Sequence, residues 1–141
     1  MEIRVVRGNI TSADVDVDVI VTAANASLIG GGVDGAVHRA AGAGLLQALR
    51  PLSPCPPGGA VLTPAFGLGP RVRHSVHAVG PRYGVDEPAS ELLASAYRAS
   101  MALCDEVAAE SVAFPALSTD AFGYPLFEAC QASAQALPRL T

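Results

Sequence analysis

The sequence predicts an α/β domain whose central strands are parallel. Strand-like and helix-like segments alternate along the 141 residues, and this order is typical of α/β domains. Segment 17–23 is almost wholly apolar, as expected for a strand buried on both faces of a parallel sheet. A glycine run and a helical pattern follow it at 30–41. The length and an apolar content of 50% suit a single domain, residues 1–141, with a sizeable core.

The first half of the chain is expected to hold two strands and two helices. Segments 3–6 and 17–23 are the predicted strands. Segments 33–41 and 44–50 are the predicted helices. Four prolines and two glycines follow at 51–59, so we expect a loop there.

The middle of the chain is expected to form two strands and a long helix. Short strands are predicted at 60–63 and 72–79, with a hairpin-like turn at 67–70 between them. A helix is predicted over 88–109, because apolar residues recur there at helical spacing and form a stripe that would face the sheet. These residues are Leu92, Leu93, Ala96, Tyr97, Met101 and Cys104.

The last part of the chain is expected to form a strand, a loop and a helix. Segment 111–115 is predicted as a buried strand and 117–124 as a loop. Pro125 is expected to open the final helix, because proline is well tolerated in the first helical turn.

Composition and charge exclude several classes of function. The formal net charge is −4 and charged residues are sparse, whereas binding to nucleic-acid backbones needs clustered cations. The three cysteines lack the spacing of a metal site and are expected to be buried, reduced thiols. The sequence has no signal-peptide pattern and no apolar run long enough to cross a bilayer. We therefore expect a cytoplasmic protein without a metal, a membrane partner or general affinity for nucleic acids.

The stretch from Asn25 to His38 is the strongest functional signal. A buried strand leads into small residues, a glycine run at 30–32 and the start of a helix. Glycines let the backbone approach a ligand closely, and a helix N-terminus presents free N–H groups and a positive dipole end. Asp34 and His38 are four residues apart, so they share one helix face. The stretch predicts a phosphate-bearing ligand with reactive side chains beside it.

A second loop of small polar residues is expected to lie near the first. Ligands of open α/β sheets bind at the carboxyl ends of the strands. Asn25 follows one predicted strand and Ser118 follows another. Two such loops at one edge of the sheet could hold a ligand from both sides.

Five segments extend over nearly the whole chain and carry recognisable motifs: 8–11 (GNIT), 17–25 (VDVIVTAAN), 30–42 (GGGVDGAVHRAAG), 77–81 (HAVGP) and 113–125 (AFPALSTDAFGYP). A lone glycine run would be weak support for any family, but these five motifs in this order resemble those of macrodomains, and within that family the MacroD type.

The resemblance implies a three-layer α/β/α fold with a central mixed, mostly parallel sheet. It also implies binding of ADP-ribose, without a metal or other cofactor. Many relatives of this type remove ADP-ribose from proteins or deacetylate O-acetyl-ADP-ribose. The implied partner is therefore ADP-ribose or an ADP-ribosylated protein.

The resemblance also assigns ligand positions. Asn25 and Asp34 are the implied catalytic residues. Asn25 would fix the distal ribose, and Asp34 would position or deprotonate a water that attacks the anomeric carbon or an acyl carbon, without a covalent intermediate. Asn9 and Ile10 would lie at the adenine, with Phe122 beside the distal ribose. The diphosphate would be held by Gly30, Gly31, Gly32 and Val33 on one side, and by Ser118, Thr119, Asp120, Ala121, Phe122 and Gly123 on the other.

Several residues depart from the family's motifs. Asn9 stands where the family has Asp, so an adenine amino group would lose a charged acceptor. Asp120 stands where the family's phosphate loop has Gly, and a carboxylate there would repel a diphosphate. Thr22 replaces an Asn and is expected to be structural. Phe122 replaces a Tyr and keeps the ring without its hydroxyl, and the run at 30–32 is one glycine shorter than usual.

Three functions stay open on the sequence alone. Asn25 and Asp34 favour an ADP-ribosyl hydrolase. Asn9, Asp120 and the short glycine run favour a non-catalytic module that binds ADP-ribose or a related nucleotide, and a domain that has kept only a structural role is the third. The family has one more strand and helix after the last predicted helix. Without that strand a sheet edge would be unpaired and could pair with a second copy, so we expect a monomer or a weak homodimer. His38 and His77 are expected to be structural, with orientation of Asp34 as the alternative for His38.

Overall fold

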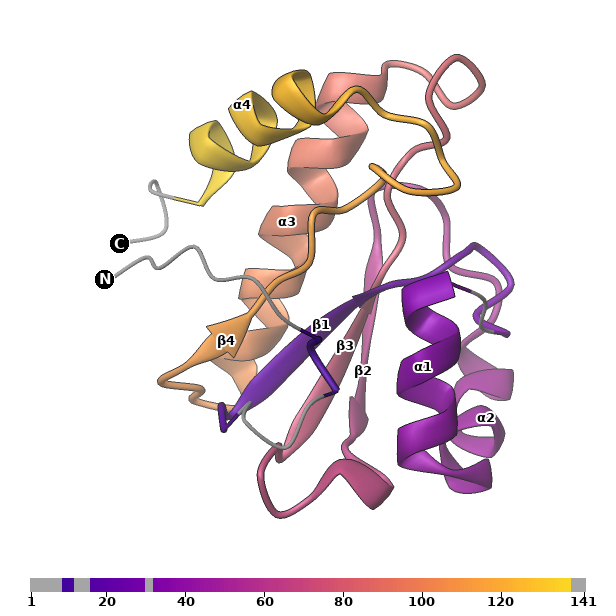
Figure 1. Cartoon of the computed structure of the whole chain (residues 1–141), viewed down its shortest axis with the longest axis vertical. Coiled ribbons are helices and arrows are strands. Elements are labelled where there is room, and N and C mark those ends of the chain that lie inside the picture. The colour runs from indigo at the N-terminus through magenta and orange to yellow at the C-terminus, as the bar shows by residue number, and fades with distance from the viewer. Residues whose placement is uncertain (1–8, 12–15, 30–31, 138–141) are drawn as a thin grey trace.

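The computed structural model describes residues 9–11, 16–29 and 32–137 (Figure 1). The strand predicted at 3–6 lies outside these residues, as do Gly30 and Gly31.

The described strands form one mixed sheet of four, in the order β2-β3-β1-β4. The strands are β1 (Val19–Ala23), β2 (Ala60–Pro64), β3 (His74–Ala78) and β4 (Val112–Ala113). β1 runs parallel to both of its neighbours, β3 and β4, whereas β2 is antiparallel to β3. The prediction of a mixed, mostly parallel sheet is therefore confirmed.

Helices cover both faces of this sheet (Figure 1). α1 (Gly32–Ala41) and α2 (Ala43–Leu49) lie on one face, and α3 (Ala89–Glu106) and α4 (Leu126–Ala136) lie on the other. Two short 3-10 turns, Arg50–Leu52 and Phe66–Leu68, stand in the connections. The expected three-layer α/β/α arrangement is confirmed.

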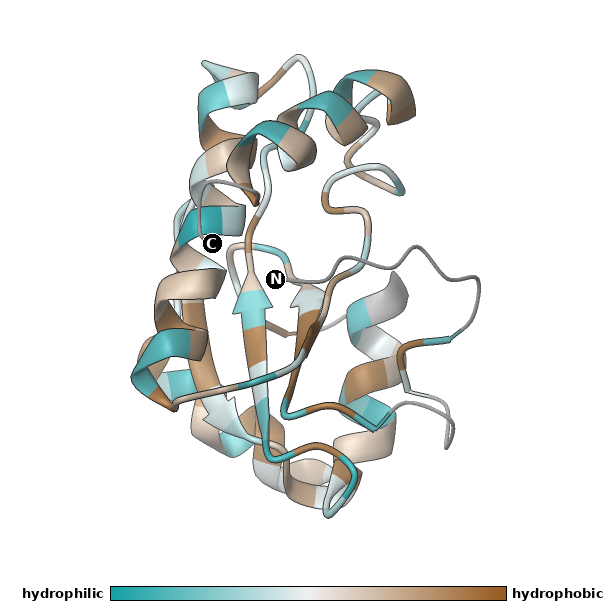
Figure 2. Ribbon diagram, turned by 90° about the vertical axis from the view of Figure 1, so that its left-hand side faces the viewer, coloured by the Kyte–Doolittle hydropathy of each residue, from teal (hydrophilic) through white to brown (hydrophobic). Residues whose placement is uncertain are grey.

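Two apolar cores lie on opposite sides of the sheet, and β1 contributes to both. Val19 and Val21 face the core under α3 and α4, whereas Ile20 faces the core under α1 and α2. All three side chains are fully buried, and burial of one such side chain contributes about 1.5–3 kcal/mol. This two-sided burial explains the continuous apolar run of β1, and Figure 2 shows hydrophobic residues in brown both in the sheet and in the helices that pack on it.

The long helix faces the sheet much as its periodicity predicts. Leu93, Ala96, Tyr97 and Cys104 are buried in the core, whereas Leu92 and Met101 are only half-buried. α3 ends at 106, earlier than the expected 109, because Ala108 adopts a left-handed conformation with φ 53°. The amides of residues 108 and 109 then bond back to the carbonyls of residues 105 and 104, which is a Schellman end.

Other differences from the predicted elements are local. β4 has two half-buried residues instead of a buried strand over 111–115, and β1 is its single described partner. Proline at 115 lacks an amide hydrogen and suits the end of an edge strand. Pro125 caps α4 instead of opening its first turn. Cys55 and Cys104 are buried as expected, but Cys130 is exposed.

Candidate functional site

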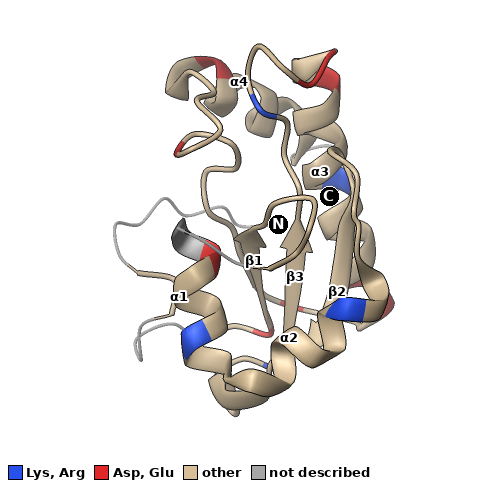
Figure 3. Ribbon diagram, turned by 90° about the vertical axis from the view of Figure 1, so that its right-hand side faces the viewer, with Lys and Arg blue, Asp and Glu red and all other residues tan. Residues whose placement is uncertain are grey.

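The predicted site residues gather at the carboxyl edge of the parallel strands. Asn25 follows β1 by two residues, and the loop with Ser118 follows β4. Because β1 and β4 are parallel, both loops leave the sheet at the same edge. The first turn of α1 lies at this edge and carries the acidic Asp34 (Figure 3). The structure thus brings the two predicted loops together around the start of α1.

The carboxylate of Asp34 is buried among three polar side chains. The side chain is 2% exposed. Its Oδ1 accepts a hydrogen bond from the Thr22 hydroxyl at 3.1 Å. Nε2 of His38 lies 3.3 Å from Oδ2, and Nδ1 of His77 lies 3.9 Å from Oδ1. Oδ2 is itself buried, and among the described residues it accepts no hydrogen bond.

Thr22 has a role that sequence reasoning missed. Its side chain is fully buried and its hydroxyl holds Asp34. The β-branched side chain suits a strand, which is why its sequence position suggested a structural residue only. The signal that could have found it is its position: Thr22 lies in the strand that immediately precedes the ligand loop.

The loop after β1 is fixed by its own hydrogen bonds. The Asn25 carbonyl accepts from the Leu28 amide at 3.0 Å, and Asn25 Oδ1 accepts from the Ser27 hydroxyl at 2.9 Å. Leu28 is buried with φ 63°, which closes the turn. The amide of Cys55 bonds to the Ala26 carbonyl at 2.8 Å and ties this loop to the loop before β2. These bonds fix the loop that carries Asn25, whose side chain is half-buried.

The loop after β4 is also closed internally. The Ser118 carbonyl accepts from the Tyr124 amide at 2.8 Å, and the Asp120 carbonyl accepts from the Gly123 amide at 3.0 Å. Ser118 and Gly123 have positive φ, 68° and 71°, which turns the chain back on itself. The Phe122 carbonyl accepts from the amide of Tyr83 at 2.8 Å, so the loop is anchored to the segment after β3. Thr119 is half-buried and Ala121 is exposed.

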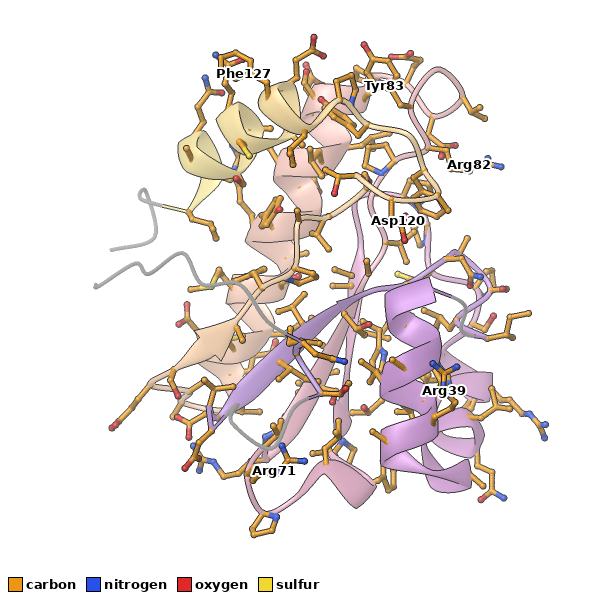
Figure 4. All side chains as sticks on the ribbon, viewed as in Figure 1. Arg39, Arg71, Arg82, Tyr83, Asp120 and Phe127 are labelled. Atoms are coloured by element: carbon orange, nitrogen blue, oxygen red, sulfur yellow. The ribbon has the colours of Figure 1, made fainter. Side chains whose placement is uncertain are left out.

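Asn9 and Asp120, two further departures from the family's motifs, differ in their surroundings. Asp120 is exposed on the loop that lies above the start of α1 (Figure 4). Asn9 is exposed, and its Oδ1 accepts two hydrogen bonds from Thr11, one from the amide at 2.9 Å and one from the hydroxyl at 2.7 Å. The side-chain amide nitrogen is therefore the group of Asn9 that a ligand would meet. Ile10 is half-buried and packs against the core under α1 and α2.

The glycine run is described only in part. Gly32 and Val33 form the first residues of α1, so their backbone amides lie at the helix N-terminus. The predictions for Gly30 and Gly31 lie outside the described residues.

Metal-binding clusters and membrane-spanning helices are both absent from the described part of the chain. No group of three or more His, Cys, Asp or Glu side chains within it could hold a metal ion. None of its helices is both long enough and apolar enough to cross a membrane.

The protein is an α/β domain. Its polar loops and a buried carboxylate lie at the carboxyl ends of the parallel strands, where such domains bind ligands. The family model for the macro domain matches residues 21–133, and the chain belongs to this family.

Named relatives and solved structures agree with this assignment. An O-acetyl-ADP-ribose deacetylase of Cronobacter sakazakii is 50% identical over 135 residues, which cover 92% of this chain and 73% of that protein. A macrodomain of Oceanobacillus iheyensis with ADP has a TM-score of 0.85 and 38% identity, covering 94% of this chain and 72% of the other. A Trypanosoma brucei macrodomain in complex with ADP-ribose has a TM-score of 0.84 and 36% identity, covering 95% of this chain and 55% of the other.

Proposed function

We propose that the protein binds ADP-ribose and hydrolyses ADP-ribosyl adducts, either mono-ADP-ribosylated protein or O-acetyl-ADP-ribose. The observation that carries this proposal is the buried Asp34 carboxylate, in which Thr22 donates to one oxygen and the other has no hydrogen-bond partner among the described residues. The relative named O-acetyl-ADP-ribose deacetylase and the macrodomain structures with ADP and ADP-ribose support the substrate class.

The ligand would lie across the carboxyl edge of the sheet. The N-terminus of α1 and the loop from Ser118 to Gly123 flank the place where the diphosphate would lie. Helix N-termini stabilise anions through free amides and the helix dipole. Asn9 and Ile10 would contact the base at one end, and Asn25 would hold the distal ribose at the other.

Asp34 would act as the general base through Oδ2. A water bonded to Oδ2 loses a proton to it while the water oxygen attacks the anomeric carbon or the acetyl carbon. The bond to the modified side chain or to the ribose oxygen breaks, and the leaving oxygen takes the proton back. Fixed dipoles at the start of α1 would stabilise the transition state, and Asn25 would orient the distal ribose.

The first experiment is a calorimetric titration of the whole chain with ADP-ribose, followed by turnover assays. We expect saturable binding with Kd near or below about 10 μM, a free energy of roughly −7 kcal/mol. Asp34→Ala should abolish turnover and leave the fold intact, whereas Asp105→Ala, which removes an exposed carboxylate from α3, should change neither. Absence of heat from the folded protein would contradict the binding proposal, and unchanged turnover in Asp34→Ala would contradict the role of Asp34.

A binding module without catalysis is the second candidate. It is favoured by the exposed carboxylate of Asp120 and by Asn9, whose acceptor oxygen is already used by Thr11. Saturable binding without turnover of either substrate would establish this function in place of the first.

A further inference from the structure

We propose that His77, held in place by Thr63, is a positioning residue for the Asp34 carboxylate. The inference rests on the proposed function, because it assigns a role in the chemistry of Asp34. It revises the expectation that His77 is merely structural.

The first observation is the burial of His77. The ring lies on the central strand β3 and is fully buried. A buried polar group without partners costs about 1–3 kcal/mol. Both of its nitrogens face polar atoms: Nε2 lies 3.0 Å from the Thr63 hydroxyl, and Nδ1 lies 3.9 Å from Asp34 Oδ1. The ring therefore lies between the Thr63 hydroxyl of β2 and the Asp34 carboxylate of α1, with one nitrogen toward each.

The second observation is the convergence of unpartnered polar atoms on one carboxylate. Nδ1 of His77, Nε2 of His38 and Oδ2 of Asp34 are buried, and among the described residues they have no hydrogen-bond partner. The two imidazole rings flank Asp34 with their centroids 6.5 Å apart. At 3.9 Å the His77–Asp34 pair is beyond hydrogen-bond length, and a movement of about 1 Å would close it. Contacts of catalytic groups are often long without ligand and shorten when it binds.

The Thr63 hydroxyl can donate to Nε2 or accept from it, so the tautomer of the ring decides what Nδ1 offers to Asp34, and the proposal takes the tautomer in which Thr63 donates. A neutral imidazole has one donor nitrogen and one acceptor nitrogen, and the partner of one decides the state of the other. If Thr63 donates to Nε2, the hydrogen lies on Nδ1 and points at Asp34. Oδ1 then receives donors from both Thr22 and His77, which orients the carboxylate. The buried Oδ2, 3.3 Å from His38 Nε2, is left for the water of the proposed mechanism.

Ser75 supplies an internal comparison on the same strand. It is also buried, 1% exposed, and its hydroxyl has no hydrogen-bond partner within the described residues. Ser75 precedes His77 by two residues, so both side chains point to the same face of β3. A general effect of removing a buried polar group from β3 would appear in Ser75→Ala as well.

Two substitutions of His77 distinguish the roles of its two ring nitrogens. His77→Asn keeps an amide near the position of Nδ1, facing Asp34, and loses the link to Thr63. His77→Gln reaches Thr63 and loses the group that faces Asp34. With O-acetyl-ADP-ribose as substrate, we expect His77→Gln to lower kcat by about 10- to 100-fold, because a displacement of about 1 Å can cost 100-fold. His77→Asn should have a higher kcat than His77→Gln, and Ser75→Ala should have the kcat of the wild type. KM should change little in all three variants.

Thr63 gives a second pair that leaves the histidine in place. Thr63→Val removes the hydroxyl, and we expect kcat to fall about 10-fold, a smaller loss than misplacement of the catalytic group itself. Thr63→Ser keeps the hydroxyl and should stay near the wild type. Equal losses in His77→Gln and His77→Asn, or wild-type kcat in Thr63→Val, would overturn the proposal.

A nitrogen-15 NMR measurement of the ring distinguishes failure of this inference from failure of the proposed function. We expect His77 with its hydrogen on Nδ1, and a shift of both ring nitrogens in Asp34→Asn. A hydrogen on Nε2, or resonances that do not move in Asp34→Asn, would overturn the inference even if the protein turns over substrate. If the wild type has no turnover, the hydrolase proposal fails, and the ring resonances still decide whether His77 orientates Asp34.

Discussion

The Thr22 hydroxyl donates a hydrogen bond to Asp34 Oδ1 over 3.1 Å, and both side chains are buried. The donor lies in β1 and the acceptor in the first turn of α1. This bond fixes the carboxylate to the strand whose end leads into the ligand loop. It also offsets part of the cost of burying a charged group at this place.

Thr22→Val should weaken both stability and turnover. The substitution keeps the β-branched shape and leaves Asp34 Oδ1 without this donor. We expect the free energy of unfolding to fall by about 1–3 kcal/mol. We also expect kcat to fall by a larger factor than the affinity for ADP-ribose. Thr22→Ser keeps the hydroxyl and is the matched control. Denaturant unfolding and turnover assays measure both effects, and a Thr22→Val enzyme with wild-type kcat would show that this bond is structural only.

Much of the fold follows from local pattern. The run 17–23 predicts a two-sided buried strand, and β1 contributes to both cores. Helical spacing predicts the buried stripe of α3. The length of β4 did not follow, because it depends on how many residues find a partner in β1. An expectation of burial over 111–115 could be drawn from composition, but strand pairing is set by tertiary structure.

In the candidate site, too, some features follow from the sequence and others do not. The positions of Asn25, Asp34 and Ser118 at one edge follow from strand ends in a parallel sheet. The contacts of Thr22 and His77 with Asp34 do not, because they join residues from separate elements whose distance is set by packing of α1 on the sheet. Sequence spacing relates residues within a helix or strand and says nothing of such cross-element contacts.

Asn9→Asp should tighten binding of ADP-ribose. Thr11 donates two hydrogen bonds to the Asn9 oxygen, so the amide nitrogen, a donor, is the group left for the base. A carboxylate would present a second, charged acceptor to the adenine amino group. The gain expected from a charged over a neutral acceptor is about 1 kcal/mol, or roughly fivefold in Kd.

Calorimetry with ADP-ribose measures this gain, with inosine diphosphate ribose as the control ligand. In that ligand a 6-oxo group replaces the amino group and cannot donate to a carboxylate. The Asn9→Asp variant should therefore bind inosine diphosphate ribose more weakly than it binds ADP-ribose. Unchanged Kd for both ligands would place the base away from residue 9.

Asp120→Asn should also tighten binding, by removing a charge from the loop that faces the start of α1. Asp120 is exposed, so repulsion of one phosphate charge at about 4 Å is worth about 1 kcal/mol in water. We expect roughly fivefold tighter Kd at low salt and a smaller difference at high salt, because ions screen exposed charges. Glu110→Gln, an exposed carboxylate beside β4 at the opposite end of that strand, is the control. A difference that does not depend on ionic strength would mean that Asp120 acts through the shape of the loop instead.

Asp18→Asn should reduce stability in a way that depends on pH. The Asp18 carboxylate accepts from the Glu110 amide at 2.7 Å and pairs with Arg73 at 2.9 Å, so it ties the starts of β1, β3 and β4. The backbone hydrogen bond from Glu110, opposed by partial desolvation and aided by Arg73, lowers the pKa of this carboxyl from its ordinary value of 3.8. A pKa that is lower in the folded state means that folding favours the ionised form.

The sign of the effect follows from that difference. The stabilisation is fully present above the unfolded-state pKa and is lost as the pH falls through the lower folded-state pKa. The free energies of unfolding of the wild type and Asp18→Asn should therefore differ most at neutral pH and converge in acid below about pH 4. Denaturant titrations at several pH values measure this, and Asp16→Asn, a neighbouring exposed position, should follow the wild type throughout. A gap between wild type and Asp18→Asn that stays constant down to low pH would mean that the charge of the carboxylate contributes nothing to stability.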